Sequence, residues 1–247
     1  MTRFFSSQIS PGEEFFTILN DDAQHIIKSL RMKPGEKLIL CNNITGYDHL
    51  CTITKTTKLT VDVRVEKQIK CFTEPPLKIT LFQALPKFDK LDFIIQKAVE
   101  LGVFSVVPFI SDRCISRPDK QSAEKKLPRF NKIAYDAACQ SSRSIIPAVM
   151  PIITFDEVLN KLPGFDLTVM CYEEFGAPLS KLDFSVPNLN AALIIGPEGG
   201  FLPDEAKNAE AHGAALCTLG PRILRTETAS LCALSAIMFA AGALDNS

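Results

Sequence analysis

The chain has 247 residues, of which 46% are hydrophobic and 22% charged, and its formal net charge at pH 7 is -1. This balance is typical of a globular protein of one or two domains and excludes a disordered chain. The longest apolar stretch, residues 230–244, is shorter than the roughly 20 residues that a membrane span needs, and the N-terminus has no apolar core of a signal peptide. We therefore expect a cytoplasmic protein that does not bind membranes.

The first part of the chain has the pattern of a small, mostly β domain. Four runs rich in β-type residues are expected to be strands: 14–19, 37–41, 47–54 and 59–65. A short helix is expected from Asp21 to Leu30, with His25, Lys28 and Arg31 on a shared part of its surface. The two prolines at 75 and 76 stiffen a linker. The sequence thus predicts one domain over residues 1–72 and a second over 73–247.

The second part alternates between strands and helices. Buried strands are expected at 78–85, 104–109, 167–172, 191–195 and 215–219, and helices at 88–101, 123–141, 154–161, 203–212 and 226–244. This alternation predicts an α/β fold with a parallel sheet that helices cover on both faces.

A basic segment stands out in a nearly neutral chain. Residues 113–143 contain eight basic side chains against three acidic ones. Such a local surface binds phosphates even where the net charge of the whole chain does not favour it. A solvated, lysine-rich helix face is the alternative interpretation.

Cysteines and histidines do not form a recognisable metal or catalytic pattern. The eight cysteines are scattered without a C-x-x-C pair, so we expect core thiols, with disulfides as the less favoured alternative, and no metal site. The three histidines are far in sequence from the glycine-rich turns described next.

Two predicted strands end in similar Gly-Pro turns. One reads IIGPEGGF at 194–201, and the other reads TLGPRILRTETA at 218–229. Glycine adopts backbone conformations that other residues avoid, and bare backbone lets a ligand approach closely. Ligands of open α/β sheets bind beyond the carboxyl ends of the strands. Backbone N–H and C=O groups at such turns can bind a flat polar group such as adenine. The turns match neither of the common nucleotide-binding glycine patterns, which argues against nucleoside triphosphates and nicotinamide cofactors.

These turns, together with LPKFDKLDFIIQKAVELGV and HIIKSLRMKPG, closely resemble the RsmE family of ribosomal RNA methyltransferases. That family belongs to the knotted SPOUT superfamily and methylates N3 of one uridine in 16S rRNA. The resemblance covers nearly the whole chain. It implies a PUA-like β-barrel RNA-binding domain over 1–72, a SPOUT methyltransferase domain with a trefoil knot over 73–247, and a homodimer that acts on 16S rRNA, within the small ribosomal subunit. Phe88 departs from the family pattern, which has glycine there.

The resemblance also assigns roles to residues. S-adenosylmethionine is the implied cofactor, held by Tyr172, Gly196, Glu198, Gly200, Leu219, Gly220, Ile223 and Leu224. Arg225 is expected to stabilise negative charge on the uracil, and Glu227 to accept its proton. A structural role for Glu227 at a helix N-terminus and an ion pair for Arg222 are the alternatives. Phosphate contacts are expected from Arg3, Lys28, Arg31, Arg113, Arg117 and Arg143.

The helix at 226–244 is apolar nearly all round, so one of its faces is expected to meet a second subunit. Two other functions stay open at this point. One is methylation of a ribose 2′-hydroxyl by a related knotted enzyme, and the other is RNA binding without activity.

Overall fold

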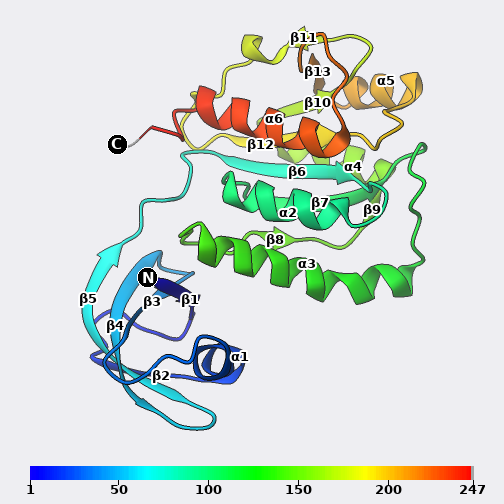
Figure 1. Cartoon of the computed structure of the whole chain (residues 1–247). Coiled ribbons are helices and arrows are strands. Elements are labelled where there is room, and N and C mark those ends of the chain that lie inside the picture. The colour runs from blue at the N-terminus through cyan, green and yellow to red at the C-terminus, as the bar shows by residue number, and fades with distance from the viewer. Residues whose placement is uncertain (246–247) are drawn as a thin grey trace. The chain divides into compact units, whose positions relative to one another are not determined.

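The computed structural model describes residues 1–245, and these form two compact units (Figure 1). The first unit contains residues 1–74 and 138–146, and the second contains 75–137 and the chain from Pro147 onward. Residues 138–146 join the first unit because Glu74 accepts hydrogen bonds from the backbone of Ser144 and Ile145 and pairs with Arg143. Residues 246 and 247, the end of the predicted second domain, lie outside the described residues.

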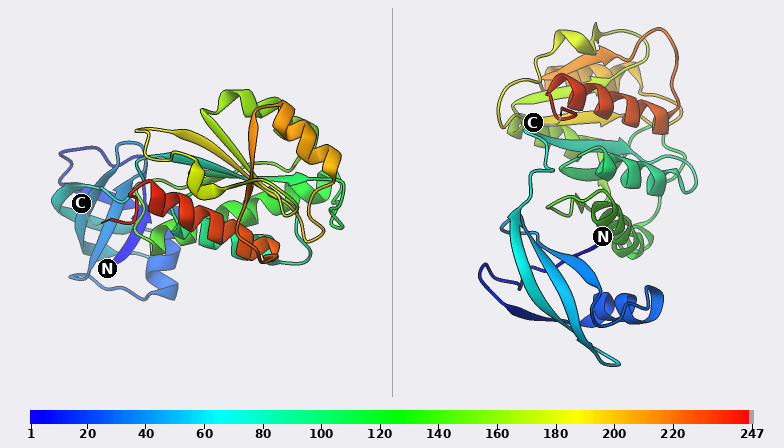
Figure 2. Two further views of the ribbon diagram at one scale, coloured as in Figure 1. Left: turned by 90° about the horizontal axis from the view of Figure 1, so that it is seen from above. Right: turned by 60° about the vertical axis from the view of Figure 1, so that its left-hand side comes forward.

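In the described chain, a five-stranded sheet forms the first unit, in the order β1-β3-β4-β5-β2 (Figure 2). Its strands are β1 (Thr2–Phe5), β2 (Phe15–Ile18), β3 (Lys37–Asn42), β4 (Tyr47–Thr56) and β5 (Val61–Lys70). The four strands predicted from sequence are confirmed, although β5 extends beyond its prediction because its second half is largely exposed and lacks an apolar pattern. The strand β1 was not predicted.

The helix of the first unit comprises α1 (Asn20–Gln24) and a π-helical turn, His25–Ser29. It covers the same stretch as predicted, but no side chain caps its N-terminus. Its apolar residues Ala23 and Ile26 are fully buried and pack in one core with the strands. In β3, the alternation of the pleated strand directs Leu38 and Leu40 into this core.

An eight-stranded sheet forms the second unit within residues 75–245, in the order β11-β13-β10-β12-β6-β7-β8, with β9 beside β7. The five predicted strands are confirmed as β6 (Lys78–Ala84), β7 (Ser105–Ile110), β10 (Leu167–Cys171), β12 (Asn190–Ile195) and β13 (Ala214–Thr218). The strands β8 (Ala148–Val149), β9 (Ile153–Thr154) and β11 (Ala177–Pro178) are too short for a sequence pattern. Every pair in this sheet is parallel, as predicted.

Helices cover both faces of this sheet (Figures 1 and 2). On one face lie α2 (Lys90–Glu100), α3 (Lys120–Gln140) and α6 (Thr226–Ala240), and on the other lie α4 (Phe155–Lys161) and α5 (Pro203–Ala211). In α2, the apolar residues Leu91, Ile94, Ile95 and Ala98 are buried.

The helix α6 ends earlier than its apolar sequence predicts. It stops at Ala240, because Gly242 adopts φ +68° and the amides of Gly242 and Ala243 bond back to carbonyls of the last turn at 3.1 and 2.9 Å. This is the usual glycine-based helix stop. Among the described residues, no helix is long and apolar enough to cross a membrane.

Candidate active site

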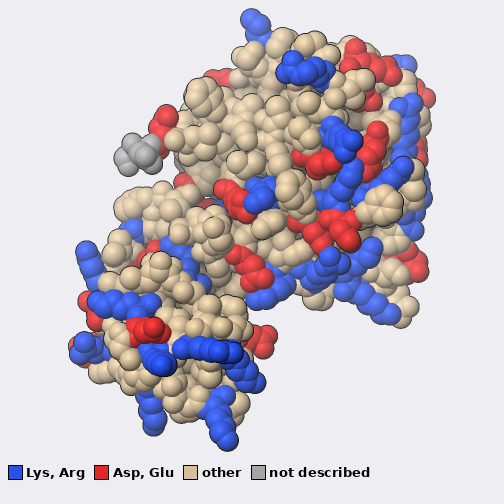
Figure 3. Space-filling view, in the orientation of Figure 1, with Lys and Arg blue, Asp and Glu red and all other residues tan. Residues whose placement is uncertain are grey.

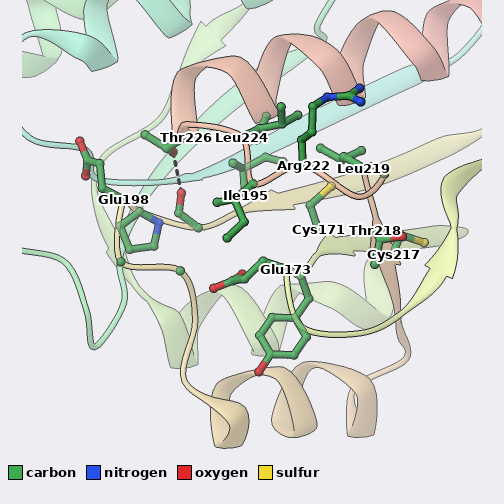
Figure 4. A pocket seen from close by; sticks show the side chains of 18 of the residues that line it. Cys171, Glu173, Ile195, Glu198, Cys217, Thr218, Leu219, Arg222, Leu224 and Thr226 are labelled. Atoms are coloured by element: carbon green, nitrogen blue, oxygen red, sulfur yellow. Dashed lines mark hydrogen bonds between the residues drawn. The ribbon is translucent and has the colours of Figure 1, made fainter.

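A cavity of about 370 Å³ lies where β10, β12 and β13 end (Figure 4). All eight residues predicted to hold a cofactor line it: Tyr172, Gly196, Glu198, Gly200, Leu219, Gly220, Ile223 and Leu224. The topology brings them together because β10 lies between β12 and β13 and runs parallel to both, so the three carboxyl ends are neighbours. A cavity of this size and place is typical of small-molecule sites in α/β proteins.

The turn after β12 needs its glycines for different reasons. A Cβ on Gly196 would lie 2.9 Å from the ring of Phe201, which is fully buried, so this glycine makes room for the core. Gly200 adopts φ +66°, a conformation that favours glycine, and a Cβ there would lie 1.6 Å from a carboxylate oxygen of Glu173. A Cβ on Gly199 would meet Arg113 at 3.3 Å. The bare backbone therefore borders other side chains as well as the cavity.

The loop after β13 forms the opposite wall of the cavity. Gly220 adopts φ +93°, a conformation that favours glycine, and a Cβ there would project into open space with no protein atom within 4 Å. Leu219 and Leu224 are half-buried, whereas Ile223 is 89% exposed. An apolar side chain so exposed at the rim of a cavity is available to a ligand or to a second molecule.

Glu173 follows β10 and reaches toward the turn after β12 (Figure 4). Within the part of the chain that the structure describes, its carboxylate has no hydrogen bond or ion pair. It therefore leaves a negative charge at the cavity wall. The neighbouring Tyr172 is buried, and burial raises the pKa of its hydroxyl. Sequence reasoning missed Glu173, although an acidic residue directly after a predicted strand is a signal for this position.

A lysine at the start of α2 joins two acidic residues of the site. The Lys90 ammonium lies 3.1 Å from Glu198 and 3.1 Å from Glu227. Hydrogen bonds to these carboxylates raise the pKa of Lys90. Desolvation acts to raise the pKa of Glu198, but hydrogen bonds from its own backbone amide, from the Lys87 amide at 3.1 Å and from Lys90 outweigh it, so this pKa is lowered. Lys90 thus ties the Gly-Pro turn to α6.

A chain of buried hydrogen bonds also reaches this turn. The Thr226 hydroxyl donates to the Gly196 carbonyl at 2.6 Å (Figure 4) and accepts from the side-chain amide of Gln83 at 2.9 Å. The Ser230 hydroxyl donates to the side-chain amide oxygen of Gln83 at 2.5 Å. Gln83 and Ser230 are fully buried and Thr226 nearly so. This network fixes the Gly196 carbonyl to α6, and only Gln83, a polar residue in an apolar strand, hinted at it in the sequence.

The two predicted catalytic residues lie beside the cavity, and neither is part of its lining. Arg225 directly precedes α6, and its side chain is exposed with no hydrogen bond or ion pair among the described residues. Glu227 lies in the first turn of α6 and is held by Lys90. An acidic residue in the first turn also stabilises a helix through its interaction with the helix dipole. The geometry thus fits both interpretations of Glu227 that the sequence left open.

Comparison with known proteins identifies the family. Residues 73–238 match the RNA methyltransferase domain family, and residues 18–66 match the RNA methyltransferase PUA domain family. The ribosomal RNA small subunit methyltransferase E of Bacillus subtilis is 37% identical over 230 residues, which cover 91% of this chain and 90% of that protein. The chain belongs to the ribosomal RNA small subunit methyltransferase E family.

Other members of the ribosomal RNA small subunit methyltransferase E family are similar to this chain over nearly its whole length. The protein of Mesomycoplasma hyopneumoniae is 34% identical, and the alignment covers 94% of this chain and 96% of that protein. The crystal structure of the Neisseria gonorrhoeae protein bound to S-adenosyl methionine is 33% identical, with a TM-score of 0.87 and 97% of both chains covered. The predicted family, the α/β methyltransferase domain and the PUA-like N-terminal domain are confirmed.

Exposed cations of this methyltransferase include four of the residues predicted to contact RNA: Lys28, Arg31, Arg113 and Arg117. Arg113 donates to the Gly199 carbonyl at 2.8 Å, and Arg117 donates to three carbonyls of residues 111–114 at 2.7 to 3.1 Å. Lys and Arg side chains also gather along α3 (Figure 3). Some of this charge is neutralised locally, since Lys132 lies 3.0 Å from Asp136.

Two other residues predicted to contact RNA are structural instead. Arg3 is 6% exposed and donates to both carboxylate oxygens of Asp48, at 2.6 and 2.5 Å. Arg143 is 3% exposed and pairs with Glu74 at 2.5 Å. A buried guanidinium that is already bound to a carboxylate does not reach a phosphate, so the structure corrects this expectation. Counting charges in the sequence does not reveal which cations have an internal partner.

Burial disfavours a nucleophilic role for the two cysteines that line the cavity. Cys171 and Cys217 line it, and burial raises the pKa of both thiols, which disfavours the reactive thiolate. In the described part of the chain, no group of three or more histidine, cysteine, aspartate or glutamate side chains is arranged to hold a metal ion.

Proposed function

We propose that this protein transfers a methyl group from S-adenosylmethionine to N3 of a uridine in 16S rRNA of the small ribosomal subunit. The observation that carries this proposal is the cavity built by the two Gly-Pro turns, in a chain that belongs to a family with a member solved with this cofactor. Because ribosomes are assembled in the cytoplasm, we place the protein there.

The residues of the cavity suit the cofactor. Bound S-adenosylmethionine supplies a methyl group on a positively charged sulfur. The leaving group, a thioether, is uncharged. Backbone of Gly196, Gly200 and the loop 219–224 offers donors and acceptors for the adenosine, beside Tyr172. The unpaired carboxylate of Glu173 gives the wall a negative charge that complements a cationic ligand.

The acceptor sets the main task of the protein side chains. N3 of uracil carries a proton and becomes a good nucleophile only after this proton is lost. The enzyme therefore has to favour the uracil anion. We assign Arg225 to the uracil oxygens, because its exposed guanidinium at the rim presents two parallel donors. We assign Glu227 to receive the proton, directly or through water, with Lys90 fixing the position of its carboxylate.

The target base also has to be unpaired, because N3 is occupied in a base pair. We propose that Lys28 and Arg31, in the PUA-like domain over residues 1–72, and Arg113 and Arg117, in the methyltransferase domain over 73–247, contact phosphates of the RNA. Such contacts position RNA without reading its sequence.

We further propose a homodimer. The outward side of α6 exposes Cys232, Ala236, Phe239 and Ala240, and the Phe239 ring is 73% exposed. Small residues around an exposed aromatic ring permit close approach of a second backbone, most simply across a two-fold axis. Ile223 at the rim of the cavity gives this partner a way to contribute to the site.

Mass mapping of rRNA from cells with and without the protein tests the function. We expect one uridine of 16S rRNA to lose a methyl group from its base in the deleted strain and to regain it on complementation. A methyl group located on a ribose would instead indicate the related 2′-hydroxyl activity. Unchanged rRNA would leave only an RNA-binding role.

A further inference from the structure

Phe88 combines backbone strain with almost complete exposure. It adopts φ +58°, a conformation that is unfavourable for a residue with a Cβ and rare for bulky side chains. Its side chain is 91% exposed, so burial of the ring does not offset this strain. Strained residues of this kind persist where the surroundings fix them, and they cluster at functional sites.

The residues on both sides of Phe88 hold it in place. The amide of Lys87 and the ammonium of Lys90 both bind the Glu198 carboxylate in the Gly-Pro turn. Asp89, the next residue, accepts a hydrogen bond from the Asp92 amide at 3.1 Å as α2 begins. The ring therefore projects from a turn that is fastened directly to the wall of the cavity. It is not itself part of that wall.

The hollow that Phe88 lines is mixed, with apolar side chains such as Leu91 and Phe130 beside Asp89, Asp92 and two cations. Phe88 shares a small hollow with Lys126 and Arg129 of α3 and with Ser116. Arg129 pairs with Asp92, while Lys126 is exposed and, in the chain as described, has no ion pair. The centre of a protein–protein interface is depleted in charge, whereas single-stranded RNA is bound by aromatic rings that stack on bases among cations that contact phosphates.

We propose that the Phe88 ring stacks on an unpaired base of the substrate RNA, next to the uridine that enters the cavity. This inference rests on the proposed function, because the ligand is the RNA substrate of the same site. The stacked base is a neighbour of the methylated uridine, since the ring lies outside the cavity. The ring is 91% exposed and its neighbours Lys87 and Lys90 are fixed to Glu198, so a base can lie against it.

The absence of tryptophan from the sequence makes a direct test possible. In Phe88→Trp, the introduced indole is the only tryptophan, and stacking on a base quenches its fluorescence. We expect quenching by a single-stranded, uridine-containing RNA at concentrations where filter binding shows a complex. Val186→Trp is the control, because Val186 is also exposed but precedes β12 and so lies at the end of the sheet opposite to the cavity.

A second variant measures the contribution to binding. Phe88→Gly removes the ring and suits the positive φ, so its melting temperature stays at or above that of the wild type. We expect its affinity for the RNA to fall roughly 5- to 150-fold, the effect of losing one stacked base, while its affinity for S-adenosylmethionine in calorimetry is unchanged.

The outcomes separate this inference from the proposed function. If Phe88→Trp is not quenched by RNA that it binds, or if Phe88→Gly binds RNA as the wild type does, the stacking site is wrong even where methyl transfer occurs. If quenching occurs but no methyl group reaches the RNA, the stacking site stands and the proposed activity fails. A wild-type protein that binds no RNA overturns both.

Discussion

Replacing Thr226 with valine removes one oxygen atom from the centre of the active-site network and leaves the shape of the side chain unchanged. Two hydrogen bonds are lost: the one donated to the Gly196 carbonyl at 2.6 Å and the one accepted from Gln83 at 2.9 Å. Gln83 is fully buried, so one N–H of its amide is left without a partner and without water. The Gly196 carbonyl borders the cavity, where water replaces the lost donor.

These two losses differ in magnitude. A buried donor without a partner costs about 1–3 kcal/mol, and a hydrogen bond replaced by one to water costs about 0.5–1.5 kcal/mol. The free energy of unfolding therefore falls by about 1.5–4.5 kcal/mol. At about 2–4 °C for each kcal/mol in a domain of this size, the melting temperature falls by about 3–18 °C. The affinity for S-adenosylmethionine falls as well, because the Gly196 carbonyl is no longer fixed to α6.

Differential scanning calorimetry measures this effect against two matched variants. Thr228→Val makes the same substitution two residues along α6, at an exposed site, and is expected to melt close to the wild type. Thr226→Ser retains the hydroxyl and should recover most of the loss. If Thr226→Val melts within about 2 °C of Thr228→Val, the network does not stabilise the site as we describe.

Three further predictions concern charge and assembly. In calorimetry, Glu173→Gln should weaken binding of S-adenosylmethionine more than binding of S-adenosylhomocysteine, the product, whose sulfur is uncharged. The adjacent Glu174→Gln is the control and should not show this difference. Equal losses of affinity for both ligands in Glu173→Gln would contradict a charge-based role. The pKa of Glu198 is lowered from its ordinary value of 4.5, so the ionised carboxylate stabilises the fold above that pH. This contribution disappears as the pH falls through the folded-state pKa. The difference in unfolding free energy between the wild type and Glu198→Gln should therefore shrink on acidification. A constant difference from pH 7 to about pH 3 would argue against the ion pair with Lys90. Ala236→Arg, on the outward side of α6, should give monomers with little methyl transfer in sedimentation and activity assays, and a fully active wild-type monomer would refute the proposed dimer.

The turns of the site were predictable from sequence because their chemistry is local. Glycine and proline at 196–200 and 220–221 directly follow apolar strands, and the direction of parallel strands then brings both turns to one edge of the sheet. The strand periodicity likewise predicted the long strands, whereas β8, β9 and β11 are two residues each and carry no pattern.

The supporting residues were not predictable because their partners are distant in sequence. Gln83 is 143 positions from Thr226, and Lys90 is 108 positions from Glu198, so no local pattern connects them. The same limit explains the error at Arg3, whose partner Asp48 is 45 positions away on a neighbouring part of the sheet. The unusual residue at position 88 was noted only through the family resemblance, and its left-handed backbone supplies the physical reason why glycine suits that position.

The hydrogen bond from Arg113 to the Gly199 carbonyl would couple RNA binding to cofactor binding if Arg113 contacts a phosphate as we propose. A phosphate that draws this guanidinium toward itself withdraws a donor from the turn that lines the cavity. A shared contact of this kind produces a coupling free energy, and thermodynamics requires that each ligand change the affinity of the other by the same factor. The coupling would then act through one main-chain oxygen, and replacement of Arg113 should make the two affinities independent of each other.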